Sequence, residues 1–426
     1  MTVPLKESGV DWLGQIPAHW DVVPPTALFA ESKERARDGD QMLSATQKYG
    51  VIPLADFEAL EGRQVTKAIA NLEMRKHAEI GDFVISMRSM DGGLERSRAV
   101  GSVRSSYTVL KPGPDVEGRF YGALFKSSLF IQALRLTSNF IRDGQDLNFG
   151  HVRKLRLPKP PHAEQAAIAD YLDRAISRTD ALISKKIRFI ELLREKRQAL
   201  ITHAVTRGLD AAAPMKDSGV EWLGEVPVHW SVVKFGRIAR VTEGLVDPRI
   251  EPYLSMLLIA PNHVESGTGR LISLETAEDQ NAESGKYYCR EGSIIYSKIR
   301  PALAKAVLAP RECLCSADMY PLNCADEISP KWLLNLLLSQ AFTSWALLES
   351  DRVAMPKINR ESLYELIVAV PPLSEQLAIT AEINARLPRI DALIATTERS
   401  IDLLREHRTA LITAAVTGKI DLRDAP

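Results

Sequence analysis

The chain is a tandem repeat, and this feature constrains its fold more than any other. Residues 8–23 (SGVDWLGQIPAHWDVV) and 218–233 (SGVEWLGEVPVHWSVV) are identical at 11 of 16 positions, at an offset of 210. Residues 191–206 (ELLREKRQALITHAVT) and 402–417 (DLLREHRTALITAAVT) share 12 of 16 positions, at an offset of 211. At average residue usage, two unrelated segments of this length would share roughly one identical position by chance. The middles of the two halves have diverged, so the repeat predicts one common frame carrying two different central regions.

Each half contains the same order of segments. A Trp/Pro/His/Trp opening is followed by short β-rich runs such as Asp82–Ser86, Ser106–Leu110 and Ser293–Ser297, then by a Pro-Pro pair and a long helix. This order predicts an α+β fold with two globular domains related by the repeat. The predicted boundaries are residues 1–157 and 211–368 for the globular domains, and 158–210 and 369–426 for the helical regions.

Two long helices are predicted, over about residues 164–205 and 375–416. Gly208 and Gly418 lie just past their ends, where a left-handed cap is expected. Ser374 is the predicted N-cap of the second helix. Pro388 predicts a kink or a short break within it.

Apolar positions at alternating spacings of three and four residues define one seam on each helix. The first seam is Leu172, Ile176, Thr179, Ile183, Lys186, Ile190, Leu193, Arg197, Leu200 and Ala204. The second is Ile383, Leu387, Ile390, Ile394, Thr397, Ile401, Leu404, Arg408, Leu411 and Ala415. Each helix could pack on its own domain alone. The matching length and phase instead favour an antiparallel coiled coil, in which about 50 Å of helix separates the two globular domains.

Composition restricts the class of protein. The hydrophobic content is 45% and the charged content 25%, as in soluble globular proteins. No apolar run reaches the length of a membrane span, and residues 1–12 do not resemble a signal peptide, so we expect a cytoplasmic protein. The four cysteines are Cys289, Cys313, Cys315 and Cys324. They lack the spacing of a zinc site, and we expect ordinary thiols and no metal.

The segments that resemble a known family are the SGVxWLGxxPxHW opening, the PPxxEQ entry to a long helix and the LLREKRQALIT-type ending. All three occur twice and in order over essentially the whole chain. They resemble the specificity subunits of Type I restriction–modification enzymes. The resemblance implies two target recognition domains, one for each half of a split DNA site. It also implies two methyltransferase subunits that bind S-adenosylmethionine, and motor–nuclease subunits in the full complex.

Catalytic motifs were sought and are absent from the sequence. There is no [ND]PP[YF] tetrapeptide of a methyltransferase and no GxxxxGK[ST] phosphate loop. The acidic residues of LEMRKHAEIGD could be drawn into a nuclease-like cluster, but solvated charges explain them more simply. His19 and His229, at matching positions, are predicted to fix the opening segments and not to catalyse. We therefore expect a non-catalytic subunit without a cofactor of its own.

Basic residues at matching places in the two halves are the candidates for DNA contact, since Lys and Arg supply affinity for phosphates. The net charge of the chain is zero, but residues 25–155 carry a net +3 and residues 235–366 a net −3. One set follows a predicted strand, where Gly92 and Gly93 indicate a loop: Arg88, Arg96, Arg98 and Arg104, matched by Lys298, Arg300 and Lys305. A second set precedes the Pro-Pro pairs: Arg142 and Gln145, matched by Arg352 and Lys357. Asn148 and Asn359 align beside it but are expected to cap turns.

Two alternatives remain open at this point. A coiled-coil scaffold that never contacts DNA would bind other proteins through its globular ends, and the negative balance of the second half favours it. An enzyme with an unrecognised site in one diverged middle would need a His/Asp/Glu or Cys constellation, and none emerges. Salt-dependent binding to duplex DNA separates the first alternative from a specificity subunit.

Overall fold

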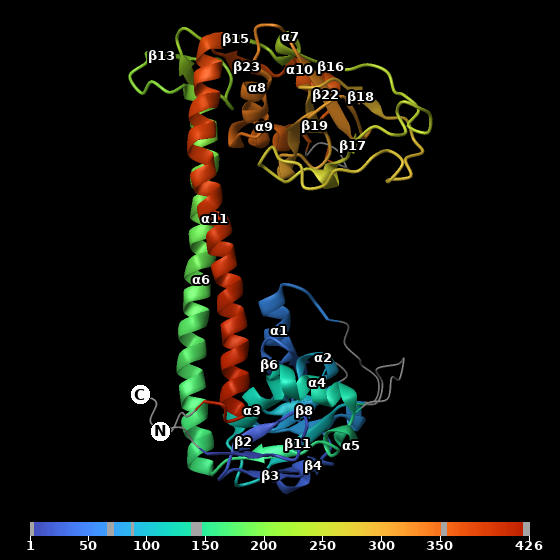
Figure 1. Ribbon diagram of the computed structural model, residues 1–426, viewed down its shortest axis with the longest axis vertical. Helices are drawn as coiled ribbons and strands as arrows, with labels where there is room; N and C mark the ends of the chain where they lie inside the picture. Colours follow the sequence, from blue (N-terminus) through green and yellow to red (C-terminus); the bar gives the residue numbers. More distant parts are fainter. Residues whose placement is uncertain (1–3, 66–71, 87–88, 138–146, 351–355, 421–426) are drawn as a thin grey trace. The chain divides into compact units, whose positions relative to one another are not determined.

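The computed structural model describes residues 4–65, 72–86, 89–137, 147–350 and 356–420. The chain divides into two compact units (Figure 1). Unit 1 is Met1–Lys186 with Arg399–Pro426, and unit 2 is Ile187–Glu398. Each unit combines antiparallel sheet, short helices and parts of the same two long helices, so the fold is α+β.

Unit 1 is built on a four-stranded antiparallel sheet of order β4-β11-β8-β9. Its strands are β4 (Phe29–Ser32), β11 (Thr108–Pro112), β8 (Phe83–Ile85) and β9 (Glu95–Arg96). The flanking antiparallel pairs are β1 (Leu5–Glu7) with β2 (Gln15–Pro17), β3 (Asp21–Val23) with β12 (Leu157–Lys159), β5 (Leu43–Thr46) with β6 (Gly50–Pro53), and β7 (Lys76–Ala78) with β10 (Gly101–Val103). The short helices are α1 (Leu54–Glu61), α2 (Ser89–Gly92), α3 (Gly118–Lys126), α4 (Ser128–Leu136) and α5 (Phe149–Val152), with 3-10 turns η1 (Pro25–Ala27) and η2 (Leu72–Met74).

The core of unit 1 is aromatic. Helix α3 buries Phe120, Tyr121 and Phe125 because these positions fall on one helical face. The ring of Phe125 meets that of Phe83 from β8 edge-on, with centroids 5.2 Å apart. Trp20, from the opening motif, packs edge-on against Phe120 in the same cluster. The opening segment is therefore an integral part of the domain core.

Unit 2 has a sheet of the matching order, β16-β22-β19-β20, also antiparallel. Its strands are β16 (Ala239–Val241), β22 (Met319–Cys324), β19 (Ile294–Ser297) and β20 (Ala306–Leu308). A three-stranded sheet contains β17 (Leu258–Ile259), β21 (Cys313–Cys315) and β18 (Tyr287–Cys289), and the two-stranded pairs are β13 (Met215–Asp217) with β14 (Glu225–Pro227) and β15 (Ser231–Lys234) with β23 (Ile367–Val370). The short helices are α7 (Phe235–Ile238), α8 (Pro330–Leu337), α9 (Gln340–Ser350) and α10 (Arg360–Glu365), with 3-10 turns η3 (Pro261–His263) and η4 (Pro301–Leu303).

The four cysteines are free thiols in unit 2. Three of them, Cys289, Cys313 and Cys315, are fully buried in one apolar cluster. Burial raises the pKa of the Cys324 thiol to about 11. These thiols behave as small apolar side chains at neutral pH.

The two long helices are α6 (His162–Arg207) and α11 (Leu373–Val416). In unit 1 the start of α6 packs on the end of α11, where Leu172 shares a core cluster with Ala415 and Val416 (Figure 1). In unit 2, Arg194 bonds Glu398 at 3.0 Å, whereas Arg197, farther along α6, bonds Asp391 at 3.0 Å, nearer the start of α11. The helix segments are therefore antiparallel within each unit.

The predicted seam positions are the covered face of each helix. Every one of them is buried or half-buried. Apolar residues off the seam, such as Leu182, Leu192, Leu393 and Leu403, are exposed. The seam is thus part of the covered face of both helices, and this face is wider near the domains, where Ile201, Val205 and Ile379 lie off the seam and are fully buried.

The motif residues at the helix starts join the helices to the domains. The Glu164 carboxylate accepts hydrogen bonds from Trp20 Nε1 at 3.1 Å and lies 2.7 Å from His19 Nε2. In unit 2, Glu375 makes the same contacts with Trp230 and His229. Each unit therefore anchors its opening segment to the first turns of one long helix.

A glycine lies at the end of each long helix, where the helix meets an opening segment. Gly418, past the end of α11, and Gly208, past the end of α6, have φ of +69° and +77°, the expected left-handed caps. A Cβ on Gly418 would lie 2.3 Å from Pro17 Cδ, and one on Gly208 would lie 3.0 Å from Glu375 Oε1. Each glycine thus permits close packing against an opening motif or the Glu beneath it.

Three sequence expectations need correction. Helix α11 continues through Pro388 without the predicted break, because Pro388 and Asn384, whose carbonyl loses its partner, both face solvent. Ser374 is not the N-cap, because the helix already begins at Leu373. The loop predicted at Gly92 and Gly93 is shorter than expected, because Gly92 is the last residue of α2 and only Gly93 lies in the connection to β9. Gly93 has φ +75°, and a Cβ there would lie 1.8 Å from the Phe125 carbonyl oxygen, so both the backbone conformation and close packing require this glycine.

Candidate nucleic-acid interface

Two segments of unit 2 that were predicted to contact DNA, one with Lys298 and Arg300 and one with Lys357, meet at the end of β19. Ile299 pairs with Lys357 in an isolated β-bridge, and the backbone N–H of Ile358 donates to the carbonyl of Lys298 at 2.8 Å. The Lys298 ammonium lies over the ring of Tyr320, 5.1 Å from its centroid. Arg300 and Lys357 are exposed. Three predicted cations therefore share one surface at the end of a buried strand.

The backbone beside these cations is strained. Arg300 has φ +48° and Ala304, at the other end of η4, has φ +43°. Left-handed conformations cost non-glycine residues about 1 kcal/mol each or more, and they concentrate at functional sites. Arg300 is therefore an exposed cation on a strained turn.

Lys305 lies apart from this group. Its ammonium donates to the Pro261 carbonyl at 2.6 Å and lines a groove between the globular part of unit 2 and its helices, which we call the unit 2 groove. Charged residues of the groove are Arg194, Arg197, Arg270, Lys305, Glu265, Asp391 and Glu398. The sequence predicted that Lys305 lies with Lys298 and Arg300. In the structure the turn η4 separates Lys305 from them, and Lys305 lines the unit 2 groove.

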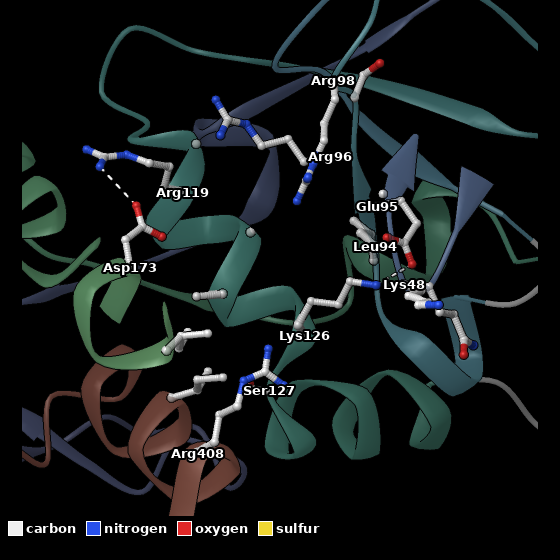
Figure 2. A pocket seen from close by; sticks show the side chains of 18 of the residues that line it. Lys48, Leu94, Glu95, Arg96, Arg98, Arg119, Lys126, Ser127, Asp173 and Arg408 are labelled. Carbon is white, nitrogen blue, oxygen red and sulfur yellow. Dashed lines mark hydrogen bonds and ion pairs between the residues drawn. The ribbon is translucent and has the colours of Figure 1, made fainter. Parts of the chain in front are cut away.

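In unit 1, Arg96 and Arg98 line a pocket of about 660 Å³, which we call the unit 1 pocket (Figure 2). Its charged residues are Lys48, Arg96, Arg98, Arg119, Lys126 and Arg408, with Glu95 and Asp173. They come from the β5–β6 turn, β9, α3 and the two long helices. Six cations against two carboxylates make this pocket strongly electropositive.

Ion pairs neutralise part of this charge. Lys126 bonds Glu95, which is 3% exposed, and burial raises the pKa of this carboxyl against the lowering effect of Lys126. Arg119 bonds Glu117 at 3.0 Å and Asp170 at 2.6 Å. Arg98 lies near enough to Glu95, and Arg96 to Glu117, to lower the pKa of each carboxyl, but neither arginine forms an ion pair or a side-chain hydrogen bond within the described part of the chain.

Arg104 is exposed just after β10 and does not line the pocket. Its charge lies near Arg75, whose pKa is lowered mainly by burial and then by Arg104. The remaining predicted residues, Arg88, Arg142, Gln145 and Arg352, lie outside the described residues. Asn148 and Asn359 are helix N-caps, accepting from the N–H groups of Gly150 and Ser362.

His77, from the acidic segment considered above, belongs to a charge network. It is fully buried, with Nδ1 2.8 Å from Asp40 and Nε2 2.9 Å from Glu79. Burial lowers the pKa of His77, but the hydrogen bonds to both carboxylates outweigh it, so the pKa is raised. Both ring nitrogens face acceptors, which an imidazolium satisfies. Among the described residues, no group of three or more His, Cys, Asp or Glu is placed to hold a metal ion.

Known proteins are similar to parts of this chain. Residues 227–405 match the family described as the Type I restriction modification DNA specificity domain. The Type I restriction enzyme EcoDI specificity subunit of Escherichia coli is 31% identical over 286 residues, which is 64% of this chain and 64% of that subunit. Over these residues the chain is similar to Type I restriction–modification specificity subunits. The alignment spans just under two thirds of the EcoDI subunit's length.

Further relatives and solved structures are also similar to this chain. The MjaVIII specificity subunit of Methanocaldococcus jannaschii is 23% identical over 319 residues, 68% of this chain and 70% of that one. A chain from a solved structure of a type I R-M system is similar in fold, with a TM-score of 0.69 at 14% identity, covering 95% of this chain and 99% of that chain. The HsdS subunit from Thermoanaerobacter tengcongensis matches with a TM-score of 0.53, also at 14% identity, covering 95% and 98% of the two chains.

Several residues of the unit 1 pocket were not predicted from the sequence. Lys48, Arg119 and Lys126 are isolated cations in ordinary amphipathic segments, and nothing in the sequence separates them from surface charge. Arg408 carried a signal, because a charged residue in an otherwise apolar seam needs a partner or a ligand. No helix in the described ranges is long and apolar enough to cross a membrane.

Proposed function

We propose that this chain is the DNA sequence-specificity subunit of a Type I restriction–modification complex. It recognises a bipartite, asymmetric DNA target and directs methyltransferase and restriction subunits to it. The observation that carries this proposal is the family match over residues 227–405, within a chain whose two halves share one frame. Exposed cations at the end of β19 and in the unit 1 pocket supply the chemistry for phosphate binding.

The two target recognition domains in this proposal are residues 1–157 and 211–368, related by a pseudo-two-fold repeat. Helices α6 and α11 form the antiparallel coiled coil that separates them. The covered seam on both helices and the antiparallel contacts within each unit support this arrangement. A helix of 46 residues is about 69 Å long, enough to keep two readers on separate half-sites with an unread spacer between them.

The chain itself is non-catalytic in this proposal and acts in the cytoplasm. It binds no cofactor, and S-adenosylmethionine belongs to the methyltransferase subunits. The partners are double-stranded DNA, two methyltransferase subunits and, in the full complex, the restriction motor–nuclease subunits. The helix and opening motifs resemble those of specificity subunits, and this resemblance supports a chain that recognises DNA while its partners catalyse.

Methylome sequencing tests the proposal. A host expressing this chain with its methyltransferase partner is compared with a host expressing the partner alone. A new methylated motif with two short defined parts around an unread spacer is the expected result. If the chain co-purifies with an active methyltransferase and no new motif appears, the specificity function is refuted.

Duplex binding separates this function from a coiled-coil scaffold that does not touch DNA. The specificity subunit with its methyltransferase partner should bind duplex DNA with an affinity that falls steeply between 50 and 200 mM salt, on the order of 10³-fold for several phosphate contacts. A scaffold would show no duplex binding at either salt concentration. The alternative therefore makes the opposite prediction in the same titration.

A further inference from the structure

The unit 1 pocket and the unit 2 groove occupy matching places in the repeat but differ in charge. Arg408 lines the pocket, and Arg197, at the same position of the repeat, lines the groove. The pocket has six cationic and two acidic lining residues, whereas the groove has four and three. The diverged domains have therefore placed different electrostatic environments beside the same pair of helices.

The cations of the unit 2 groove are satisfied internally. Arg197 has only 9% of its side chain exposed, bonds Asp391 at 3.0 Å and donates to the Gly267 carbonyl at 2.7 Å. Arg270 bonds Glu265 at 3.0 Å, and Arg194 bonds Glu398 at 3.0 Å. Lys305 donates to a backbone carbonyl, as described above. Each cation of the groove already has an acceptor, so an added anion gains little there.

Arg408 in unit 1 has a looser arrangement. It lies 3.3 Å from Asp180, the counterpart of Asp391, but 42% of its side chain is exposed. The 3.3 Å contact joins the Arg408 Nε to Asp180 Oδ1 as an ion pair without hydrogen-bond geometry, so this guanidinium is held less firmly than that of Arg197. Figure 2 shows the Arg408 guanidinium directed into the pocket, toward the side from which Arg98 reaches in. In the described part of unit 1, no backbone carbonyl accepts from Arg408 as the Gly267 carbonyl accepts from Arg197 in unit 2.

Arg96 is the second under-satisfied cation. Its buried Nε has no acceptor in the described ranges, and the guanidinium lies against Gly118, where a Cβ would be 2.9 Å from Nε. An unpaired buried donor costs about 1–3 kcal/mol. Arg98, two residues on, is exposed at the pocket. The guanidinium groups of Arg96, Arg98 and Arg408 thus line the unit 1 pocket, and some of their N–H donors are not used in hydrogen bonds among the described residues.

We propose that the unit 1 pocket binds backbone phosphates of duplex DNA through Arg96, Arg98 and Arg408, and that the unit 2 groove does not. This inference rests on the proposed function and assigns most of its ionic affinity to the first half of the chain. Guanidinium groups bind phosphate oxygens through paired N–H donors, which suits the unused donors here. Of the six cations of the pocket, only Arg96 and Arg98 lack an ion pair in the described ranges, and these two charges can pair with two successive phosphates of a DNA strand.

The test is a salt titration of DNA binding by the complex of this chain with its methyltransferase partner. The variant Arg96→Gln/Arg98→Gln/Arg408→Gln is compared with Arg194→Gln/Arg270→Gln in the unit 2 groove. Two duplexes are used, one with the methylated motif and one with a scrambled sequence. Loss of phosphate contacts should lower the slope of log K against log salt by about 0.9 per contact, equally for both duplexes.

The expected result is a reduced slope for the unit 1 variant, with the methylated motif unchanged, and the native slope for the unit 2 variant. Arg98→Lys in the otherwise native chain should keep most of the slope, because the charge remains. Equal slopes for the native protein and the unit 1 variant, with a native circular-dichroism spectrum and co-purification, overturn the proposal. Equal losses in both variants also overturn it.

One further outcome distinguishes a free anion from DNA phosphates as the ligand of the pocket. Another distinguishes failure of the pocket proposal from failure of the proposed function. If inorganic pyrophosphate raises the melting temperature of the native complex but not of the unit 1 variant, while the DNA slopes are equal, the pocket serves a free anion and the DNA assignment is wrong. If the native complex binds neither duplex, the proposed function itself fails. The proposal on the pocket alone fails when native binding is intact and the unit 1 variant matches it.

Discussion

Gln376 is a buried amide at the start of α11 that bonds three backbone groups of unit 2, two in the segment before α8 and one just before α11. It is 1% exposed. Its Oε1 accepts from the backbone N–H of Ser329 at 2.8 Å, and its Nε2 donates to the carbonyls of Glu327 at 3.1 Å and Pro371 at 2.9 Å. Ser329 is the N-cap of α8. Gln376 therefore ties the long helix to the globular domain through three satisfied backbone groups.

Replacing Gln376 by Ala removes all three hydrogen bonds at once. Each contributes about 1 kcal/mol net, so the free energy of local unfolding should fall by ~3 kcal/mol. This is a large part of the stability of an ordinary domain. Gln376→Glu should be no better at neutral pH, because a carboxylate cannot donate to the two carbonyls.

Hydrogen exchange with mass spectrometry measures this loss locally, which matters because two units need not unfold together. Amides in the first turn of α8 should exchange roughly 100-fold faster in Gln376→Ala, from the conversion of ~3 kcal/mol at 1.4 kcal/mol per tenfold. Leu377→Ala is the matched control, because Leu377 is the next residue and is 55% exposed. It should change exchange little. An increase below threefold in Gln376→Ala would refute this account of the motif.

Three further predictions concern stability. The raised pKa of His77 means that its ion pairs stabilise unit 1 fully below the unfolded pKa of about 6.5 and lose this effect as pH rises through the folded pKa; His77→Gln should flatten the pH dependence of urea denaturation, and an unchanged profile contradicts the assignment. Arg197→Ala should cost about 2–3 kcal/mol because it strands the Asp391 carboxylate and a carbonyl, whereas the half-exposed Arg408→Ala should cost below about 1 kcal/mol; equal costs by urea titration argue against the difference in burial. Pro388→Ala restores a helical N–H and should stabilise α11 by about 1–3 kcal/mol, which thermal unfolding measures. An unchanged melting temperature would mean that Pro388 does not destabilise the helix.

The frame of the molecule follows from local rules that the sequence displays. The predicted helices, about 164–205 and 375–416, differ from α6 and α11 by two residues or fewer at each end. Periodicity and C-terminal glycines determine these ends, and both are local. Strand β11 was displaced by two residues from the predicted Ser106–Leu110, because its register depends on pairing with β4 and β8 and not on its own composition.

The candidate site was only partly predictable, because it is assembled from distant segments. Arg96 and Arg98 were identified as basic residues near a predicted strand. Their meeting with Lys126 and Arg408 depends on how β9, α3 and α11 pack, and that packing is tertiary. Likewise, Lys305 was grouped with Arg300 by sequence proximity, but the strained turn at η4 separates them.

The chain path through unit 1 has a consequence for biosynthesis. Unit 2 is one continuous stretch, Ile187–Glu398, whereas unit 1 joins the first 186 residues to Arg399 and beyond. A ribosome therefore releases all of unit 2 before the final helical turns that pack on Leu172 and seat Gly418 against Pro17 and Trp20. The domain made first is completed last. Until then its apolar helix-binding face is uncovered, which makes the N-terminal half the more exposed to aggregation and chaperone capture during synthesis.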